Sequence, residues 1–171
     1  MKIQRLHIPA LLAMCASLTL AAVIADADNP KLKPHDPVEC STTTTMELSN
    51  VIIKAKDVAV KVTGDCAVSI KNSQIIGDKA ALEVTSGGSI SVVNTVVISK
   101  DKAVFLTGVG AIDLTDSVVH GKKFAVRMTN RGSVSAENTT FYGKKKLHQL
   151  SSYAGDKKSK FLKWKPYKAK K

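Results

Sequence analysis

The sequence contains the stretch Ala67-Val68-Ser69-Ile70-Lys71-Asn72-Ser73-Gln74-Ile75-Ile76-Gly77, and its pattern returns every 22 residues. The blocks align without a gap from Thr45 to Cys66, Ala67 to Gly88, Ser89 to Gly110 and Ala111 to Gly132, and then from Ser133 onward. Within a block, apolar and polar residues alternate, as around Leu82 and Val84. Alternation with period two is typical of β-strands, and glycine-containing turns separate the alternating segments. Each block therefore predicts three short strands and three turns.

One polar column of this alignment contains Asn50, Asn72, Asn94, Asp116 and Asn138. We interpret it as a structural ladder at a bend of the chain, where buried side-chain amides satisfy backbone groups and one another between neighbouring repeats. Asp116 keeps the acceptor of such an amide and loses the donor.

Strands that repeat every 22 residues predict an all-β parallel β-helix of about five coils, stacked about 4.8 Å apart. The pattern Val68-x-Ile70-x-Asn72-Ser73-x-Ile75-x-Gly77 resembles the coil motif of right-handed parallel β-helix proteins, the pectate-lyase-like superfamily, over about Thr45 to Leu150. This resemblance implies that the strand around Leu82 belongs to the first sheet, where such enzymes place their active site. The columns expected to face outward there are Ala59, Ala81, Ala103 and Ala125; Lys61, Glu83, Phe105 and Arg127; and Thr63, Thr85, Thr107 and Thr129.

A charged turn gives an independent indication of the stacking. Its two columns read Lys56, Asp78, Lys100, Lys122 and Asp57, Lys79, Asp101, Lys123. The sign of the charge alternates over the first three repeats, so that stacked neighbours attract each other. We expect ion pairs between coils that specify the register, each contributing well under about 1 kcal/mol because they lie at the surface.

The N-terminal segment has the pattern of a secretory signal peptide. Lys2 and Arg5 precede an apolar run over residues 8–24, and Ala25-Asp26-Ala27 offers a cleavage site. We expect cleavage after Ala27 and an exported protein, periplasmic or secreted. A retained membrane anchor is the alternative.

Cleavage would remove Cys15 and leave Cys40 and Cys66. An even pair in an oxidising compartment suggests one disulfide, and two unpaired buried cysteines are the alternative.

Patterns typical of a metal or catalytic site are absent from the sequence. Four scattered histidines and no CxxC or HxxxH motif lead us to expect no metal and no cofactor. Glu83 is the only carboxylate in the outward columns of the first sheet, too few for a Ca²⁺-dependent lyase or for the carboxyl pair of a glycoside hydrolase. We assign no catalytic residue, and we interpret His120 as an ordinary turn residue.

The positive charge is concentrated at the C-terminus: residues 144–171 contribute +10 of the net charge of +12, from 11 Lys and one Asp. Lysines interleaved with aromatic residues suit a polyanion such as lipid head groups, acidic polysaccharide or nucleic acid. The segment has no arginine, so no specific DNA readout is expected. A compatible alternative is a cap in which Phe161, Leu162 and Trp164 cover the last coil. The candidate binding residues are Lys157, Lys158, Lys160, Lys163, Trp164, Lys165, Tyr167, Lys168, Lys170 and Lys171.

These patterns divide the chain into a signal peptide (residues 1–27), an N-terminal arm and cap (28–44), a parallel β-helix (45–150) and a Lys- and aromatic-rich tail or cap (151–171). The function they favour is an exported, non-catalytic module that binds an anionic polymer or a membrane surface through the tail. The alternatives are a small or degenerate polysaccharide lyase or hydrolase of the pectate-lyase-like type, and a structural scaffold that self-associates through the β-helix ends.

Overall fold

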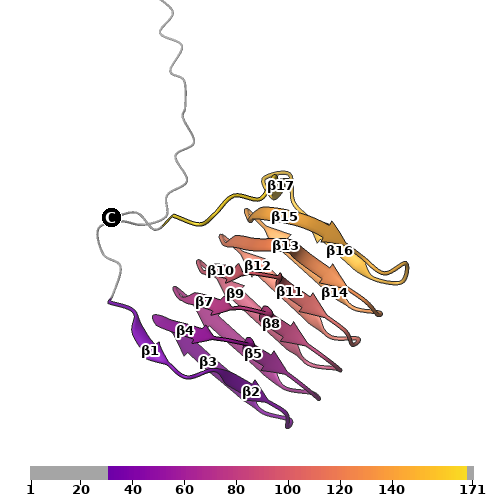
Figure 1. The fold of residues 1–171 in the computed structure, drawn as a ribbon. Coiled ribbons are helices and arrows are strands. Elements are labelled where there is room, and N and C mark those ends of the chain that lie inside the picture. Colours follow the sequence, from indigo (N-terminus) through magenta and orange to yellow (C-terminus); the bar gives the residue numbers. More distant parts are fainter. Residues whose placement is uncertain (1–30, 169–171) are drawn as a thin grey trace, which may run out of the picture.

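The computed structural model describes residues 31–168, whose regular structure consists of 17 β-strands with no helix. The strands stack as a parallel β-solenoid of about six turns, running from β1–β3 at one end to β15–β17 at the other (Figure 1). The parallel β-helix expected from the repeat is therefore confirmed. The signal-peptide segment with its cleavage site, together with Lys170 and Lys171, lies outside the described residues.

Three faces run along the solenoid. The β4 face contains β1 (Lys33–His35), β4 (Val51–Ala55), β7 (Gln74–Gly77), β10 (Val96–Ser99), the first part of β13 (Val118–Met128), the first part of β15 (Thr140–Lys146) and β17 (Lys160–Leu162). The β5 face contains β2 (Val38–Cys40), β5 (Val58–Val62), β8 (Ala80–Val84), β11 (Lys102–Leu106) and the later parts of β13 and β15. The β3 face contains β3 (Thr45–Ser49), β6 (Ala67–Lys71), β9 (Ser89–Val93), β12 (Ala111–Thr115), β14 (Ser133–Glu137) and β16 (Ser152–Gly155).

The pairing register follows the sequence repeat, since Val68 pairs with Ile90, Ile90 with Ile112 and Ile112 with Val134. Pairing also continues beyond the five blocks. Val38 pairs with Val60 at the 22-residue spacing, whereas the spacing is shorter where Lys33 pairs with Val51, Ser133 with Ser152 and Thr140 with Lys160. A gap-free alignment does not reveal the pairings with the shorter spacing. They explain why the solenoid has about six turns instead of the five expected.

The alanine column expected on the outer surface is buried instead, and that expectation is wrong. Ala59, Ala81, Ala103 and Ala125 have no exposed surface. The chain bends at this point from the β4 face into the β5 face, and the register passes over the alanines, pairing Lys102 with Ala80 and then Val104 with Leu82. The strict alternation of inward and outward side chains fails at such a bend, and small side chains fill the interior there.

The asparagine column lies at the bend between the β3 and β4 faces, but its burial was wrongly predicted. Asn50 is half-buried and the other four members are exposed. All five have positive φ, between 47° and 56°, a left-handed conformation that Asn and Asp adopt more readily than most residues. Side-chain hydrogen bonds join two of the steps, from Asn94 Nδ2 to Asn72 Oδ1 (2.9 Å) and from Asn138 Nδ2 to Asp116 Oδ1 (2.6 Å).

The hydroxyl residue that follows each of these positions forms a buried polar ladder. Ser73, Thr95, Ser117 and Thr139 are all buried. Each hydroxyl oxygen accepts a hydrogen bond from a backbone N–H of the preceding coil, at 3.2 to 3.4 Å, and donates to the carbonyl two residues before it in the chain, at 2.7 to 3.0 Å. Buried donors and acceptors are thereby satisfied in the interior by the hydroxyls, whereas the sequence predicts this role for the amides.

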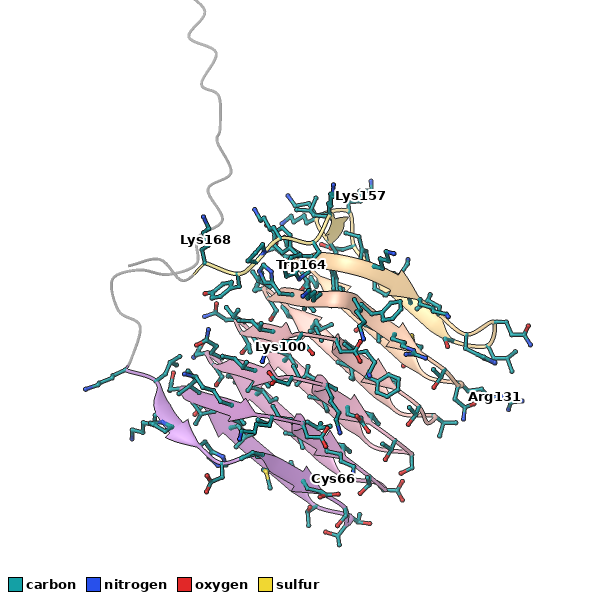
Figure 2. All side chains as sticks on the ribbon, viewed as in Figure 1. Cys66, Lys100, Arg131, Lys157, Trp164 and Lys168 are labelled. Carbon is teal, nitrogen blue, oxygen red and sulfur yellow. A yellow bond between two sulfur atoms is a disulfide. The ribbon has the colours of Figure 1, made fainter. Side chains whose placement is uncertain are left out.

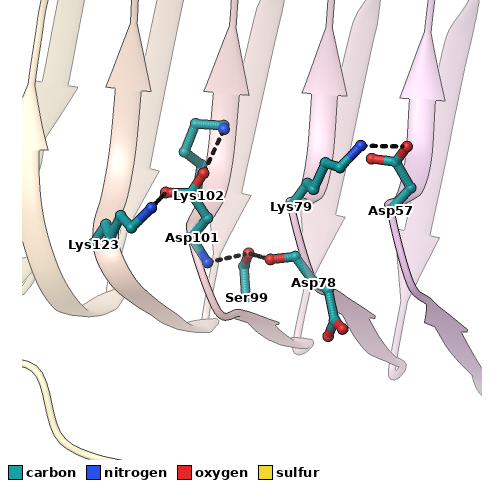
Figure 3. Close-up of polar contacts among 7 residues, drawn as sticks. All are labelled: Asp57, Asp78, Lys79, Ser99, Asp101, Lys102 and Lys123. Carbon is teal, nitrogen blue, oxygen red and sulfur yellow. Dashed lines mark hydrogen bonds and ion pairs between the residues drawn. The ribbon is translucent and has the colours of Figure 1, made fainter.

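The ion pairs predicted in the charged turn are confirmed. Lys79 Nζ lies 3.1 Å from Asp57 Oδ2, Lys100 Nζ 2.8 Å from Asp78 Oδ2, and Lys123 Nζ 3.5 Å from Asp101 Oδ1. Figure 3 shows two of these pairs, together with the contact of Lys102 with Asp101. Each pair joins neighbouring coils at the turn between the β4 and β5 faces.

A disulfide joins Cys40, at the end of β2, to Cys66, in the turn that follows β5. The two Cα atoms lie 6.0 Å apart, and both side chains are buried. The bond attaches the short first coil to the coil stacked on it.

Candidate functional site: a basic C-terminal end

Charge is distributed unequally along the solenoid. Residues 31–119 hold 9 Lys+Arg and 10 Asp+Glu, whereas residues 120–168 hold 13 Lys+Arg and 2 Asp+Glu. Among residues 31–168 there are five ion pairs, and none of them involves a lysine beyond Lys123. The basic side chains of the last coils and the tail therefore have their charge available for an anionic partner.

The predicted binding residues lie along a path over two sides of this end. Lys157 and Lys158 occupy the turn between β16 and β17, Lys160 lies in β17, and the chain from Lys163 to Lys168 continues beside the β4 face. Figure 2 shows Lys157 at the end of the stack and Lys168 at its side, with Trp164 between them. The structure adds to the predicted binding residues three exposed lysines of β15: Lys144, Lys145 and Lys146.

Aromatic rings close the end of the core beneath these lysines. Phe161 of β17 stacks on the fully buried Phe141, with ring centroids 4.5 Å apart and an interplanar angle of 9°. Tyr153 of β16 meets both rings edge-on. Lys145 Nζ lies 4.3 Å from the centroid of Tyr153 and 5.2 Å from that of Phe161. Phe161 thus covers the last core layer, whereas Leu162, expected beside it, is 38% exposed.

His120 fixes the tail to the β4 face, and sequence reasoning missed it. It lies in β13 and is only 4% exposed. Its ring stacks on Tyr142, with centroids 4.4 Å apart, and meets Tyr167 edge-on at 5.2 Å. Nδ1 lies 3.2 Å from the backbone oxygen of Lys165, so a neutral ring donates its Nδ1–H to that carbonyl.

The packing around His120 also changes its ionisation. Burial lowers the pKa of His120 from its ordinary value of 6.5 and outweighs the opposing effect of the hydrogen bond to Lys165. The interpretation of His120 as a turn residue is therefore wrong. The signal available in the sequence was Tyr142, 22 residues further on, which the repeat stacks directly against it.

One outward column of the β5 face contains Lys61, Glu83, Phe105 and Arg127, at the position where the resemblance to pectate-lyase-like enzymes implies an active site. The register places Lys61 between Glu39 and Glu83, with Lys61 Nζ 2.9 Å from Glu39 Oε1. Burial raises the pKa of the half-buried Glu83. Beyond it the column becomes aromatic and cationic, with the Arg127 guanidinium 5.8 Å from the Phe105 ring. Within residues 31–168, no three His, Cys, Asp or Glu side chains are arranged to hold a metal ion.

No family model, curated protein or solved structure matches the chain. The described part of the chain also lacks any helix long and apolar enough to cross a membrane. The fold and the candidate site together describe a parallel β-solenoid whose C-terminal end is closed by aromatic rings and carries lysines that form no ion pair within residues 31–168.

Proposed function

We propose that the protein is an exported, non-catalytic β-solenoid that binds anionic material through its basic C-terminal end. The observation that carries the proposal is the concentration of 13 Lys+Arg against 2 Asp+Glu in residues 120–168. These charges lie at one end of a rigid stack, and their fields add over that end. A polyanion is the partner class that such a surface attracts.

The chemistry of the side chains supports broad recognition of anions. Lysine interacts with phosphate or carboxylate as a point charge on a flexible stem, so it does not require one fixed ligand geometry. The aromatic residues of the tail offer apolar surface between the charges. Export is supported by the N-terminal sequence pattern, and mass spectrometry of the purified protein would show whether the chain begins at Asp28.

The test compares two triple substitutions that change the net charge equally. Lys157→Gln, Lys158→Gln and Lys163→Gln remove charge from the basic end, and Lys33→Gln, Lys56→Gln and Lys71→Gln remove it from exposed positions elsewhere. A double-stranded oligonucleotide of arbitrary sequence serves as a simple polyanion, titrated at several salt concentrations. We expect the first variant to lose about tenfold or more in affinity and to reduce the salt slope by about three.

The matched control variant should retain most of the affinity and the salt slope, because its charges lie away from the basic end. Equal losses in the two variants would show that only the net charge matters, and the proposed site would be wrong. Circular dichroism of each variant confirms that the solenoid is folded.

A further inference from the structure

The β4 face carries an apolar stripe on its outer surface. Inward residues of its strands, such as Ile75 and Val97, are fully buried, so the residues beside them point outward. The register places Ile76 beside Ile98 and Val96 beside Val118. The apolar stripe consists of five half-buried β-branched residues, with Gln74 between the first of them and Val96 in the register: Ile52, Ile76, Val96, Ile98 and Val118.

The basic tail borders this stripe directly. His120 and Tyr142 continue the column of Ile76 and Ile98, and the tail covers them through Lys165 and Tyr167. Lys165 Nζ lies 4.7 Å from the Tyr142 ring centroid. Trp164 and Lys168 therefore lie at the end of the apolar stripe (Figure 2), and one side of the molecule presents aliphatic, aromatic and cationic groups next to one another.

The charged residues of the β4 face indicate which kind of partner can bind there. The two outward columns of the β4 face contain Lys54 and Lys160 and, in the described residues, no carboxylate. A second copy of the chain docked face to face would bring lysines against lysines, and like charges oppose that contact. A soluble polyelectrolyte would use the lysines and leave the aliphatic groups in water. An anionic bilayer accommodates both, because lysines meet the head groups, Trp and Tyr favour the interface, and aliphatic side chains contact the acyl boundary.

We propose that the apolar stripe and the basic tail together form a docking surface for an anionic lipid bilayer. The inference rests on the proposed function, since the tail lysines supply the attraction. It adds the partner and the orientation, with the long axis of the solenoid lying along the membrane and the β4 face toward the lipid.

The experiment measures co-sedimentation with phosphatidylcholine vesicles that contain or lack phosphatidylglycerol. The protein is purified from the cell fraction or culture medium in which it accumulates after expression. Any cleavage of the N-terminal segment has then already taken place. The test variant carries Ile76→Thr and Ile98→Thr, which keep the β-branched shape of the strand residues. The matched control carries Val109→Thr, because Val109 is 63% exposed in the turn between β11 and β12, outside the stripe.

We expect the test variant to bind anionic vesicles about tenfold more weakly than the unmodified protein, because two apolar contacts with lipid are lost. Its affinity for the double-stranded oligonucleotide should be unchanged. The Val109→Thr control should match the unmodified protein on both ligands, and vesicles without phosphatidylglycerol should bind little of any variant.

Two results would overturn the inference while leaving the proposed function intact: undiminished vesicle binding by the test variant, or binding of the oligonucleotide without any binding of anionic vesicles. Failure of the unmodified protein to bind either ligand would instead refute the proposed function, and this inference with it.

Discussion

His120 connects the solenoid to the basic tail through its contacts with Lys165 and Tyr167. The groups that face it are Tyr142 from β15 and Lys165 and Tyr167 from the tail. Protonation would place a positive charge in a buried site beside the Lys165 ammonium, which already contributes to lowering the pKa of His120. The docked tail therefore favours the neutral ring.

We predict that acid weakens the docking of the tail. The pKa of His120 is below 6.5 when the tail covers it, so the undocked state takes up the proton first. The docked state then loses stability as the pH falls from 6.5 towards the lowered pKa, and below that value the loss is complete. The fluorescence of Trp164, the only tryptophan, should report this transition between docked and undocked tail.

The control for this prediction is His120→Asn, which removes the titrating ring and should abolish the transition. A transition of the same size and midpoint in that variant would show that His120 is not the group responsible and would contradict the prediction.

Single residues were the hardest level to predict from the sequence. The Asn column is visible in the sequence as a repeated residue type. The residue type alone does not distinguish an Asn whose amide is buried in a ladder from an Asn that adopts a left-handed conformation at an exposed bend. The buried hydroxyls of Ser73, Thr95, Ser117 and Thr139 were overlooked, because small polar residues at a turn resemble ordinary loop composition. Both mistakes concern the bend between strands. Side chains alternate between inward and outward along a strand, but this alternation does not predict their direction at a bend.

At the scale of the strand, the sequence was informative. Alternating apolar residues placed the inward columns, and the equal block length placed each residue beside its partner in the next coil. Prediction weakened at the ends of the solenoid, where β16 and β17 continue the sheets with shorter spacing and different residues. Terminal coils must meet solvent on one side, so they do not share the composition of the interior repeats.

We predict that neighbouring residues of β17 have separable roles. Phe161→Ala should lower the free energy of unfolding by about 2 kcal/mol, less than for a fully buried ring, because Phe161 is half-buried against Phe141. Lys160→Ala should change it by less than about 0.5 kcal/mol, since its side chain is exposed. Urea denaturation measures both. Equal destabilisation would mean that β17 contributes through its backbone alone.

On the scale of the whole molecule, the tail both closes the fold and carries the charge. The β-solenoid has open sheet edges at its two ends, and exposed edges invite pairing with other chains. At the C-terminal end, β16 and β17 cover β14 and β15, and the aromatic rings cover the core. Removing the tail therefore changes more than the charge.

We predict that a chain stopped after Gly143 aggregates. It lacks β16 and β17, leaves Phe141 without Phe161 and Tyr153, and exposes the edge of β14. Light scattering and size-exclusion chromatography measure the outcome. The full-length variant with three tail lysines changed to glutamine is the control and should remain monomeric. A truncated chain that stayed monomeric and folded would show that the tail is dispensable for closing the solenoid.

The unbroken register from β3 to β12 also has a consequence for how such a protein changes in length. Every interior coil contacts only the coil before and the coil after it, through the same set of positions. Copying or deleting one block of 22 residues in a gene would therefore preserve the strand register and move the two ends by one strand spacing, about 4.8 Å, although it would place like charges opposite each other in the charged turn. The length of the solenoid would therefore change in fixed increments with the number of blocks.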